Sequence, residues 1–264
     1  MSDRRESARS SAETVLELDD VSKHFSGIQA LANIHCKVEN GQIHGLIGPN
    51  GSGKSTFFNI VSGTLPVSNG RILLNGSDIT HKGAVGISRL GIARTFQGGL
   101  VVPTLTCLEN VMLGFGVHAN SPLLGTMLAL PLRAHRHERQ ARERAAALLA
   151  RVHLGDSLAR LASELVWVQR QKLQIARAVA SEPKILLLDE PTAGMGQHET
   201  EEVEALVRLI NDDGVTIMLV SHDVDMVARL SDRITVLTYG KKIAEGAAAT
   251  VLADQRVREA YLGA

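Results

Sequence analysis

The stretch IHGLIGPNGSGKST, residues 43–56, decides the fold. Its first five residues form a short run typical of a buried strand, and residues 48–55 fit the pattern GxxxxGK[ST]. The residues that follow place Phe57, Ile60 and Val61 at helical spacing. A strand that enters a glycine-rich turn and leaves it as a helix allows backbone N–H groups to surround phosphate oxygens at a helix N-terminus. The sequence therefore predicts a phosphate-binding loop over residues 48–56.

Each residue type in this loop suits a nucleoside triphosphate bound together with Mg²⁺. Glycines let the backbone approach the phosphates closely. Lys54 adds a positive charge directed toward the β and γ oxygens, and Ser55 offers its hydroxyl to the metal ion. We expect contacts to the nucleotide from eight residues of the loop: Gly48, Asn50, Gly51, Ser52, Gly53, Lys54, Ser55 and Thr56.

Two adjacent acids end the apolar run ILLLD, residues 185–189. We expect Asp189 to hold Mg²⁺ directly or through water, and Glu190 to orient and deprotonate an attacking water molecule. Two adjacent acids after a strand can also belong to a solvated turn with no catalytic role. That alternative is the weaker one here, because the same sequence contains a phosphate-binding loop. Guanine specificity has no support, because no lysine is followed two positions later by aspartate.

Apolar runs alternating with helical patterns indicate an α/β fold. Short runs at residues 15–21, 34–40 and 71–76 indicate a small antiparallel sheet beside the strand of the phosphate-binding loop. Continuous apolar runs at 185–188, 215–220 and 234–239 indicate a mostly parallel core sheet that helices cover on both faces. Residues 1–13 offer almost no apolar surface, so we expect a disordered leader.

One domain is expected over residues 14–264, with residues 98–163 as an α-helical subdomain between core segments 14–97 and 164–264. The apolar run 123–132 is expected to be a short buried helix, with contact to a membrane or a membrane protein as the alternative. Charged residues at i and i+4, Glu138 with Arg142 and Arg139 with Glu143, indicate a solvated helix face rather than an anion-binding one. The opposite stripe consists of Ala141, Ala145, Leu148, Leu149 and Val152.

The bulk composition argues against several classes of protein. With 28 basic and 28 acidic residues, the formal net charge is zero, so no overall field attracts nucleic acid or an anionic membrane. We identify neither a signal peptide nor an apolar run long enough to cross a membrane. Cys36 and Cys107 form no metal-binding or CxxC spacing, so we expect structural thiols in a reducing cytoplasm.

Four further features, in order and at suitable separations, resemble the ABC ATPase family. Gln97 in ARTFQ resembles the glutamine that senses Mg²⁺ and the γ-phosphate, and LQIARAVASEPKILLLDEPTAG (173–194) resembles the signature helix with the strand after it. His222 in LVSHD resembles the histidine that contacts the γ-phosphate. Phe25 in SKHFSG lies where the family stacks an aromatic ring on adenine.

This resemblance implies a P-loop NTPase fold of ABC type that binds ATP and Mg²⁺. It implies catalytic roles for Lys54, Gln97, Glu190 and His222, and metal binding by Ser55, Gln97 and Asp189. More narrowly, LGIARTFQ (90–97) and the ending IAEG (243–246) with VREAYLG (257–263) resemble the ATP-binding subunits of branched-chain amino acid importers, over residues 14–263. Such a subunit docks on membrane-spanning subunits at the inner, cytoplasmic face of the membrane, and it does not bind nucleic acid.

The signature motif departs from the family pattern. In the family two cassettes enclose ATP head to tail, and a segment of one closes the site of the other; this segment reads Ser, an aromatic residue or Gly, Gly and Gln. Here these positions hold Val166, Trp167, Val168 and Gln169, so only the glutamine is retained. Ser163 stands six positions before Gln169 instead of three and cannot replace the missing serine. Gly196 is a second departure, since the family usually has Asp or Asn there.

These departures predict that the chain's own catalytic residues are intact, whereas its signature segment encloses the ATP bound to a partner cassette only weakly. Such a chain forms one competent site with an ATPase subunit of normal signature, so we favour a heterodimer and expect slow turnover by a homodimer. A nucleotide-binding regulatory subunit with little or no ATPase activity remains the alternative. A soluble ABC ATPase of DNA repair or translation is disfavoured by the single cassette, the zero net charge and the lack of a long coiled-coil pattern.

Overall fold

The computed structural model describes residues 13–116 and 131–262. Residues 1–12 of the expected leader, and most of the apolar run 123–132, lie outside them. The chain divides into two compact parts. The first part combines residues 1–87 with residues 207–264, and the second part comprises residues 88–206. We describe each part by itself.

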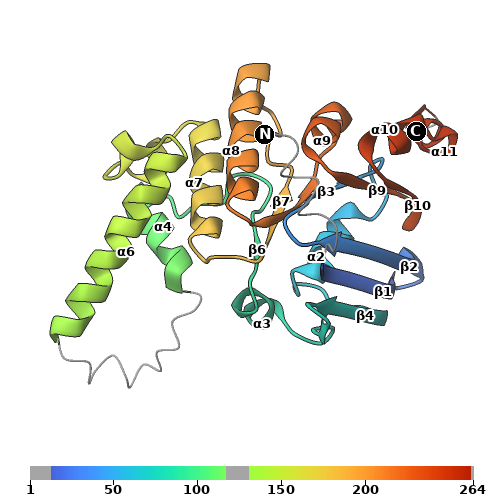
Figure 1. The fold of residues 1–264 in the computed structure, drawn as a ribbon, viewed down its shortest axis with the longest axis horizontal. Coiled ribbons are helices and arrows are strands. Elements are labelled where there is room, and N and C mark those ends of the chain that lie inside the picture. The colour runs from blue at the N-terminus through green and yellow to red at the C-terminus, as the bar shows by residue number, and fades with distance from the viewer. Residues whose placement is uncertain (1–12, 117–130, 263–264) are drawn as a thin grey trace. The chain divides into compact units, whose positions relative to one another are not determined.

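The first part contains the small antiparallel sheet that the sequence predicts (Figure 1). Strands β1 (Thr14–Phe25) and β2 (Ile28–Glu39) form a long hairpin. Strand β4 (Asn69–Leu74) pairs with the other edge of β1, and β5 (Ser77–Asp78) pairs with β4. Buried and exposed residues alternate along much of β2, as expected for a sheet with one packed face.

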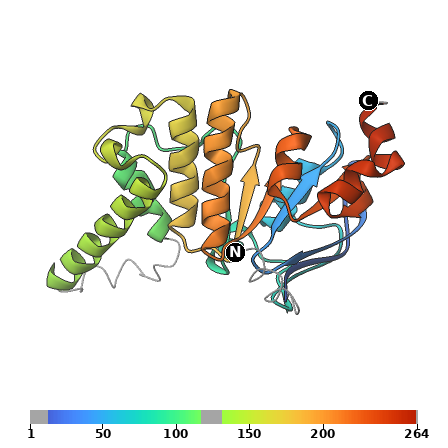
Figure 2. The same ribbon diagram turned by 45° about the horizontal axis from the view of Figure 1, so that its top comes forward.

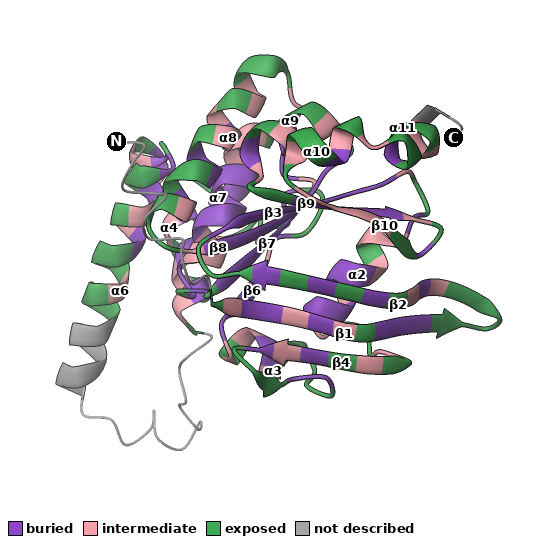
Figure 3. Ribbon diagram, turned by 45° about the vertical axis from the view of Figure 1, so that its right-hand side comes forward, coloured by how far each residue is buried: buried purple, intermediate pink, exposed green. Residues whose placement is uncertain are grey.

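The same part contains the strand that leads into the phosphate-binding loop. This strand, β3 (Ile43–Ile47), pairs in parallel with β8 (Thr216–Val220) and with β9 (Arg233–Thr238), and β10 (Lys241–Gly246) adds an antiparallel edge. Every residue of β3 and β8 is buried, as Figure 3 shows by colour. Burial on both faces explains why these strands read as continuous rather than alternating apolar runs.

Helices of the first part follow its strands. Helix α2 (Lys54–Val61) follows the loop, α3 (Ala84–Arg89) reaches the boundary of this part, and α9 (Val224–Leu230) follows β8. The C-terminal helices α10 (Ala248–Ala253) and α11 (Gln255–Leu262) form the red end of the chain in Figure 2. Val251 and Val257 anchor them by being almost fully buried.

The second part combines a parallel strand pair with helices. Strand β6 (Ile92–Arg94) pairs with β7 (Ile185–Asp189). Helix α4 (Cys107–Phe115) contacts α6 (Pro131–Arg151) and α7 (Trp167–Val179), and these helices lie together in Figures 1 and 2. Two 3₁₀ turns, Gly155–Ser157 and Ala162–Glu164, precede α7. Helix α8 (Gln197–Asp212) follows β7 and ends beyond this part.

The predicted helix before α7 is confirmed. Ala145 and Leu149 of α6 have no exposed surface, and Val152 just after the helix is also buried. On the solvated face, Arg142 lies 2.9 Å from Glu138 and Arg139 lies 3.5 Å from Glu143. Both cysteines are free and buried. The α/β class, with parallel strand pairing at its core and a small antiparallel sheet, is confirmed.

Within residues 13–116 and 131–262, none of the helices combines the length and the apolarity needed to span a membrane.

Candidate nucleotide-binding site

The glycine-rich segment after β3 leads directly into α2, as the sequence predicts. Gly53 is the residue before the helix, with φ of 103°, and Lys54, Ser55 and Thr56 form the first turn. No acidic residue lies in that turn, so no side-chain carboxylate there offsets the partial positive charge of the helix N-terminus. This helix start is therefore suited to an anion.

Two glycines of the loop stand where no side chain fits. A Cβ atom on Gly48 would lie 2.1 Å from the carbonyl oxygen of Leu237 in β9, and one on Gly53 would lie 2.7 Å from that of Ala30 in β2. Both positions have positive φ. The loop is thus pressed against the neighbouring strands, and its backbone can follow this path only with glycine at both positions.

The ammonium of Lys54 lies over the loop from which it projects. Its Nζ donates to the carbonyl oxygens of Gly48 at 2.7 Å and of Pro49 at 2.9 Å. Asn50, Gly51 and Ser55 are exposed, whereas Ser52 is buried. The loop therefore presents backbone, one cation and one exposed hydroxyl.

His222 and Phe25 belong to the same part as the loop. His222 is exposed and follows β8, in a turn where the amide of Asp223 donates to Ser221 Oγ at 3.1 Å. Asp223 in turn caps α9 by accepting from the amide of Met226. Phe25 ends β1 with 42% of its surface exposed, and the ammonium of Lys23 lies 5.1 Å from the ring centroid. Both side chains are exposed.

Asp189, the last residue of β7, and Glu190, which follows it, lie in the second part of the chain. The carboxylate of Asp189 accepts a hydrogen bond from Arg94 at 2.8 Å, and the exposed fractions of these side chains are 13% and 8%. Glu190 has φ of 49°, which is uncommon for a residue other than glycine, asparagine or aspartate. Such strain at a predicted catalytic position is the kind that functional sites retain.

Gln97 is exposed and follows β6 by three residues. The segment before it is fixed to β7, because the amide of Thr95 donates to Leu187 at 2.9 Å and the amide of Asp189 donates to the Thr95 hydroxyl at 3.3 Å. Gln174 of α7 donates to the carbonyl of Phe96 at 3.0 Å. The second part thus holds Gln97, Asp189 and Glu190 on short, hydrogen-bonded segments next to one strand pair.

Mg²⁺ fits the donor chemistry of these residues. Within the described residues no three His, Cys, Asp or Glu side chains gather into a group able to hold a metal ion. Mg²⁺ is usually bound by one or two protein oxygens together with phosphates and water rather than by a complete protein cage. A carboxylate from Asp189 and a hydroxyl from Ser55 are oxygen donors of that kind.

The signature segment forms the start of α7. Val166 is the N-cap residue, 60% exposed, and its amide donates to the side chain of Gln169 at 3.3 Å. The reciprocal half of this capping pair needs a side-chain acceptor at Val166, which valine lacks. Trp167 is 38% exposed, and its indole N–H donates to the carbonyl of Ala193 at 3.0 Å. The helix start is therefore intact but presents an apolar cap.

Gly196 is the residue before α8. Its carbonyl accepts from the amide of Thr200 at 3.0 Å, and its own amide donates to the side chain of Glu199 at 3.1 Å. A Cβ atom there would meet no atom within 4 Å. Packing within the chain therefore does not require glycine at this position.

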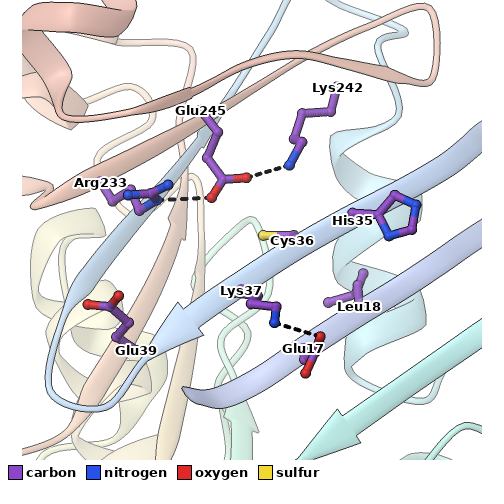
Figure 4. Close-up of a pocket in the computed structure, with 9 residues that line it drawn as sticks. All are labelled: Glu17, Leu18, His35, Cys36, Lys37, Glu39, Arg233, Lys242 and Glu245. Atoms are coloured by element: carbon purple, nitrogen blue, oxygen red, sulfur yellow. Dashed lines mark hydrogen bonds and ion pairs between the residues drawn. The ribbon is translucent and has the colours of Figure 1, made fainter. Parts of the chain in front are cut away.

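One pocket of the first part is unrelated to the predicted site (Figure 4). It has a volume of about 320 Å³ and lies against β1, β2, β9 and β10. Most of its charged groups pair with each other: Lys37 with Glu17 at 3.0 Å, and Glu245 with Arg233 at 2.9 Å and Lys242 at 2.6 Å. Burial would raise the pKa of Glu245, but these two cations outweigh it and lower the pKa. Five of the charged side chains that line the pocket therefore pair with one another.

Comparison with known proteins agrees with this geometry. Residues 31–193 match the family model for the ABC transporter, and residues 241–264 match that of the branched-chain amino acid ATP-binding cassette transporter. The chain is 36% identical over 250 residues to the high-affinity branched-chain amino acid transport ATP-binding protein BraF of Pseudomonas aeruginosa, covering 94% of this chain and 98% of the relative.

Two solved structures extend the comparison. A nucleotide-free ATP-binding cassette from an ABC transporter superposes with a TM-score of 0.82 at 31% identity, covering 95% of this chain and all of the other. A dimeric cassette, MJ0796 bound to ADP and Pi in a post-hydrolysis state, superposes with a TM-score of 0.74 at 27% identity, over 88% and 98% of the two chains.

The fold and the loop thus define an ATP-binding cassette, and the chain belongs to the ABC transporter family. Its C-terminal residues place it with the branched-chain amino acid ATP-binding cassette transporters of that family. Two functional features were missed in the sequence: the pairing of Arg94 with Asp189, and the hydrogen bond from Trp167 to Ala193. Arg94 lies in the quoted motif ARTFQ, but its partner is 95 residues away.

Proposed function

We propose that this chain is the ATP-binding subunit of an importer of branched-chain amino acids. The observation that carries the proposal is the glycine loop at the start of α2, with Lys54 over its carbonyls and no acid in the first helical turn. The C-terminal family match and the name of the BraF relative support the cargo.

The residues take the roles that their chemistry allows. Residues 48–56 bind the phosphates, Lys54 neutralises their β and γ oxygens, and Phe25 stacks on adenine. Mg²⁺, held by Ser55, Gln97 and Asp189, supplies charge neutralisation on the phosphates when bound. Glu190 orients a water molecule and takes its proton, and Gln97 and His222 bind the γ-phosphate end.

The partners follow from the family. The subunit works at the inner face of the cell membrane, peripheral to membrane-spanning subunits that carry the amino acid. Within this assembly, ATP is enclosed between two cassettes, and the dimeric relative MJ0796 supports such a pair.

The second cassette is a different subunit with a normal signature. Val166 at the N-cap of α7 has no side-chain donor for a phosphate, and Val168 places a branched side chain where backbone must approach closely. Each lost hydrogen bond to a charged group costs on the order of 1.5–3 kcal/mol, so two losses weaken closure about a hundredfold or more. The defect acts on the partner's nucleotide, while this chain's own site stays competent.

ATP turnover tests this proposal in three preparations: the purified chain alone, the chain mixed with a cassette of normal signature, and the Val166→Ser/Val168→Gly variant alone. We expect slow turnover in the first and a clear rise in the other two. No rise in either of the latter would defeat the account of a defect acting across the dimer.

The second candidate function is a regulatory subunit that holds ATP and hardly cleaves it. The apolar cap at Val166 favours it. It predicts tight ATP binding by the chain with no turnover in any of the three preparations.

A further inference from the structure

Arg94 and Asp189 form an ion pair between the ends of two parallel strands. Arg94 is the last residue of β6 and lies opposite Leu187 of β7. Its Nη2 donates to Oδ2 of Asp189 at 2.8 Å. The exposed fractions of the two side chains are only 8% and 13%, so both are largely removed from water. A charge pair in such buried surroundings interacts more strongly than one at the surface.

The guanidinium is held in this position from a second side. Its central carbon lies 5.1 Å from the ring centroid of Phe96, within the range of a cation–π contact. Phe96 is itself fixed through its carbonyl, which accepts from Gln174 of α7 at 3.0 Å. Arg94 is therefore a preorganised partner of Asp189 rather than a long side chain that happens to reach it.

A divalent cation that approaches Asp189 meets a carboxylate whose charge is already balanced. It also meets a fixed positive charge 2.8 Å from one carboxylate oxygen. Two cations at one carboxylate repel each other, and the repulsion is strong where the effective dielectric constant is well below that of water. Metal binding then requires either that Arg94 withdraws or that both cations share the carboxylate.

We propose that Arg94 sets the divalent-metal affinity of this cassette, because Mg²⁺ gains Asp189 only in competition with the Arg94 guanidinium. Arg94 acts as a positioning residue: it orients Asp189 and limits how tightly the metal is held. The inference rests on the proposed role of Asp189 in binding the metal.

The test measures metal linkage rather than activity. A fluorescently labelled, non-hydrolysable ATP analogue is titrated with the full-length chain, once with Mg²⁺ and once with EDTA. The ratio of the two dissociation constants, EDTA over Mg²⁺, is the linkage. The variants are Arg94→Gln, which keeps an N–H donor but loses the charge, and Arg94→Lys, which keeps the charge but loses the planar group that stacks on Phe96.

We expect the linkage ratio to rise about tenfold in Arg94→Gln and two- to threefold in Arg94→Lys. The matched control is Arg139→Met, which removes an arginine from the exposed face of α6 and should leave the ratio unchanged. A ratio in Arg94→Gln equal to or below the parent value overturns the inference. Should that variant not fold, an equal or lower ratio in Arg94→Lys overturns it.

Asp189→Asn separates the inference from the proposed function. This variant should lower the linkage ratio of the parent chain. If it does and Arg94→Gln has no effect, the inference fails while the role of Asp189 stands. If Asp189→Asn leaves the ratio unchanged, Asp189 does not bind the metal, and the proposed function fails at that residue together with the inference.

Discussion

The ammonium of Lys54 lies 2.7 Å from the carbonyl oxygen of Gly48, at the opposite end of the phosphate-binding loop. The same ammonium also contacts the carbonyl of Pro49 at 2.9 Å, so one lysine closes the loop on itself. A phosphate that enters the loop offers this cation a stronger, fully charged acceptor. We therefore expect a bound phosphate to compete with these two carbonyls for Lys54.

Replacing Lys54 with alanine should weaken ATP binding on the order of a hundredfold, since one to two charge-assisted hydrogen bonds are lost. Calorimetric titration with ATP and Mg²⁺ measures this. The matched control is Lys82→Ala, because Lys82 is an exposed lysine of the same part of the chain. ATP affinity equal to that of the parent in Lys54→Ala would remove the basis of the proposed function.

A serine at the N-cap of α7 should stabilise the chain. In Val166→Ser, the new hydroxyl can accept from the amide of Gln169, which completes the capping pair that now has only one half. The expected gain is about 1 kcal/mol in the free energy of unfolding, measured by urea denaturation. Val85→Ser, at an exposed valine inside helix α3, should give no gain. A loss of stability in Val166→Ser would contradict the assigned helix start.

Aspartate at position 196 should be tolerated and mildly stabilising. Gly196 precedes α8, its φ is not positive, and a side chain there has open space. An aspartate can cap the helix and favour its N-terminal dipole, worth a few tenths of a kcal/mol relative to glycine. Gly194→Asp is the matched control: it has equal space but φ of 74°, so it should be destabilising by about 1 kcal/mol. The melting temperatures of both variants test this prediction. Equal melting temperatures would refute the claim that backbone conformation distinguishes positions 194 and 196.

The stability of the chain should fall at acid pH because of His44. Burial lowers the pKa of His44 to about 4 from 6.5, Arg233 and Lys242 also lower it, and Glu245 raises it. Gln42 Nε2 lies 3.2 Å from its Nδ1, and Thr235 Oγ1 lies 2.9 Å from its Nε2, an arrangement that suits neutral imidazole. Folding therefore favours the neutral form.

The sign follows from proton linkage. Between pH 6.5 and about 4 the unfolded chain binds a proton that folded His44 does not, so stability is full above pH 6.5 and is lost on acidification. The loss is about 1.4 kcal/mol per pH unit within this window. His44→Gln should reduce the slope, whereas His81→Gln, at an exposed position, should not. Identical slopes in all three proteins, from urea denaturation at several pH values, would exclude His44 as the cause.

Much of the fold can be predicted from local pattern. The phosphate-binding loop and the neighbouring strands carry their signal within a few residues, since glycines, a lysine and apolar runs must stand at fixed short spacings. The helix stripe at Ala145 and Leu149 is equally local. These features appear in the structure where the sequence places them.

Features formed between distant residues could not be predicted in this way. Arg94 and Asp189 meet only because β6 and β7 pair in parallel, and nothing in the spacing of ARTFQ sets that register. Trp167 could be recognised as an aromatic of the signature, but its hydrogen bond to Ala193 depends on how the loop after β7 returns to α7. Side-chain partners of this kind follow from topology rather than from periodicity.

Trp167 is the only tryptophan in the sequence, and it stands half exposed at the start of α7. Indole emission moves to shorter wavelengths when water leaves its surroundings. A partner subunit that covers the start of α7 is therefore expected to change the ultraviolet emission of the unlabelled chain. A nucleotide that promotes binding of that subunit is expected to do the same. The fluorescence of Trp167 can thus be used to follow the assembly of this chain with a partner over time.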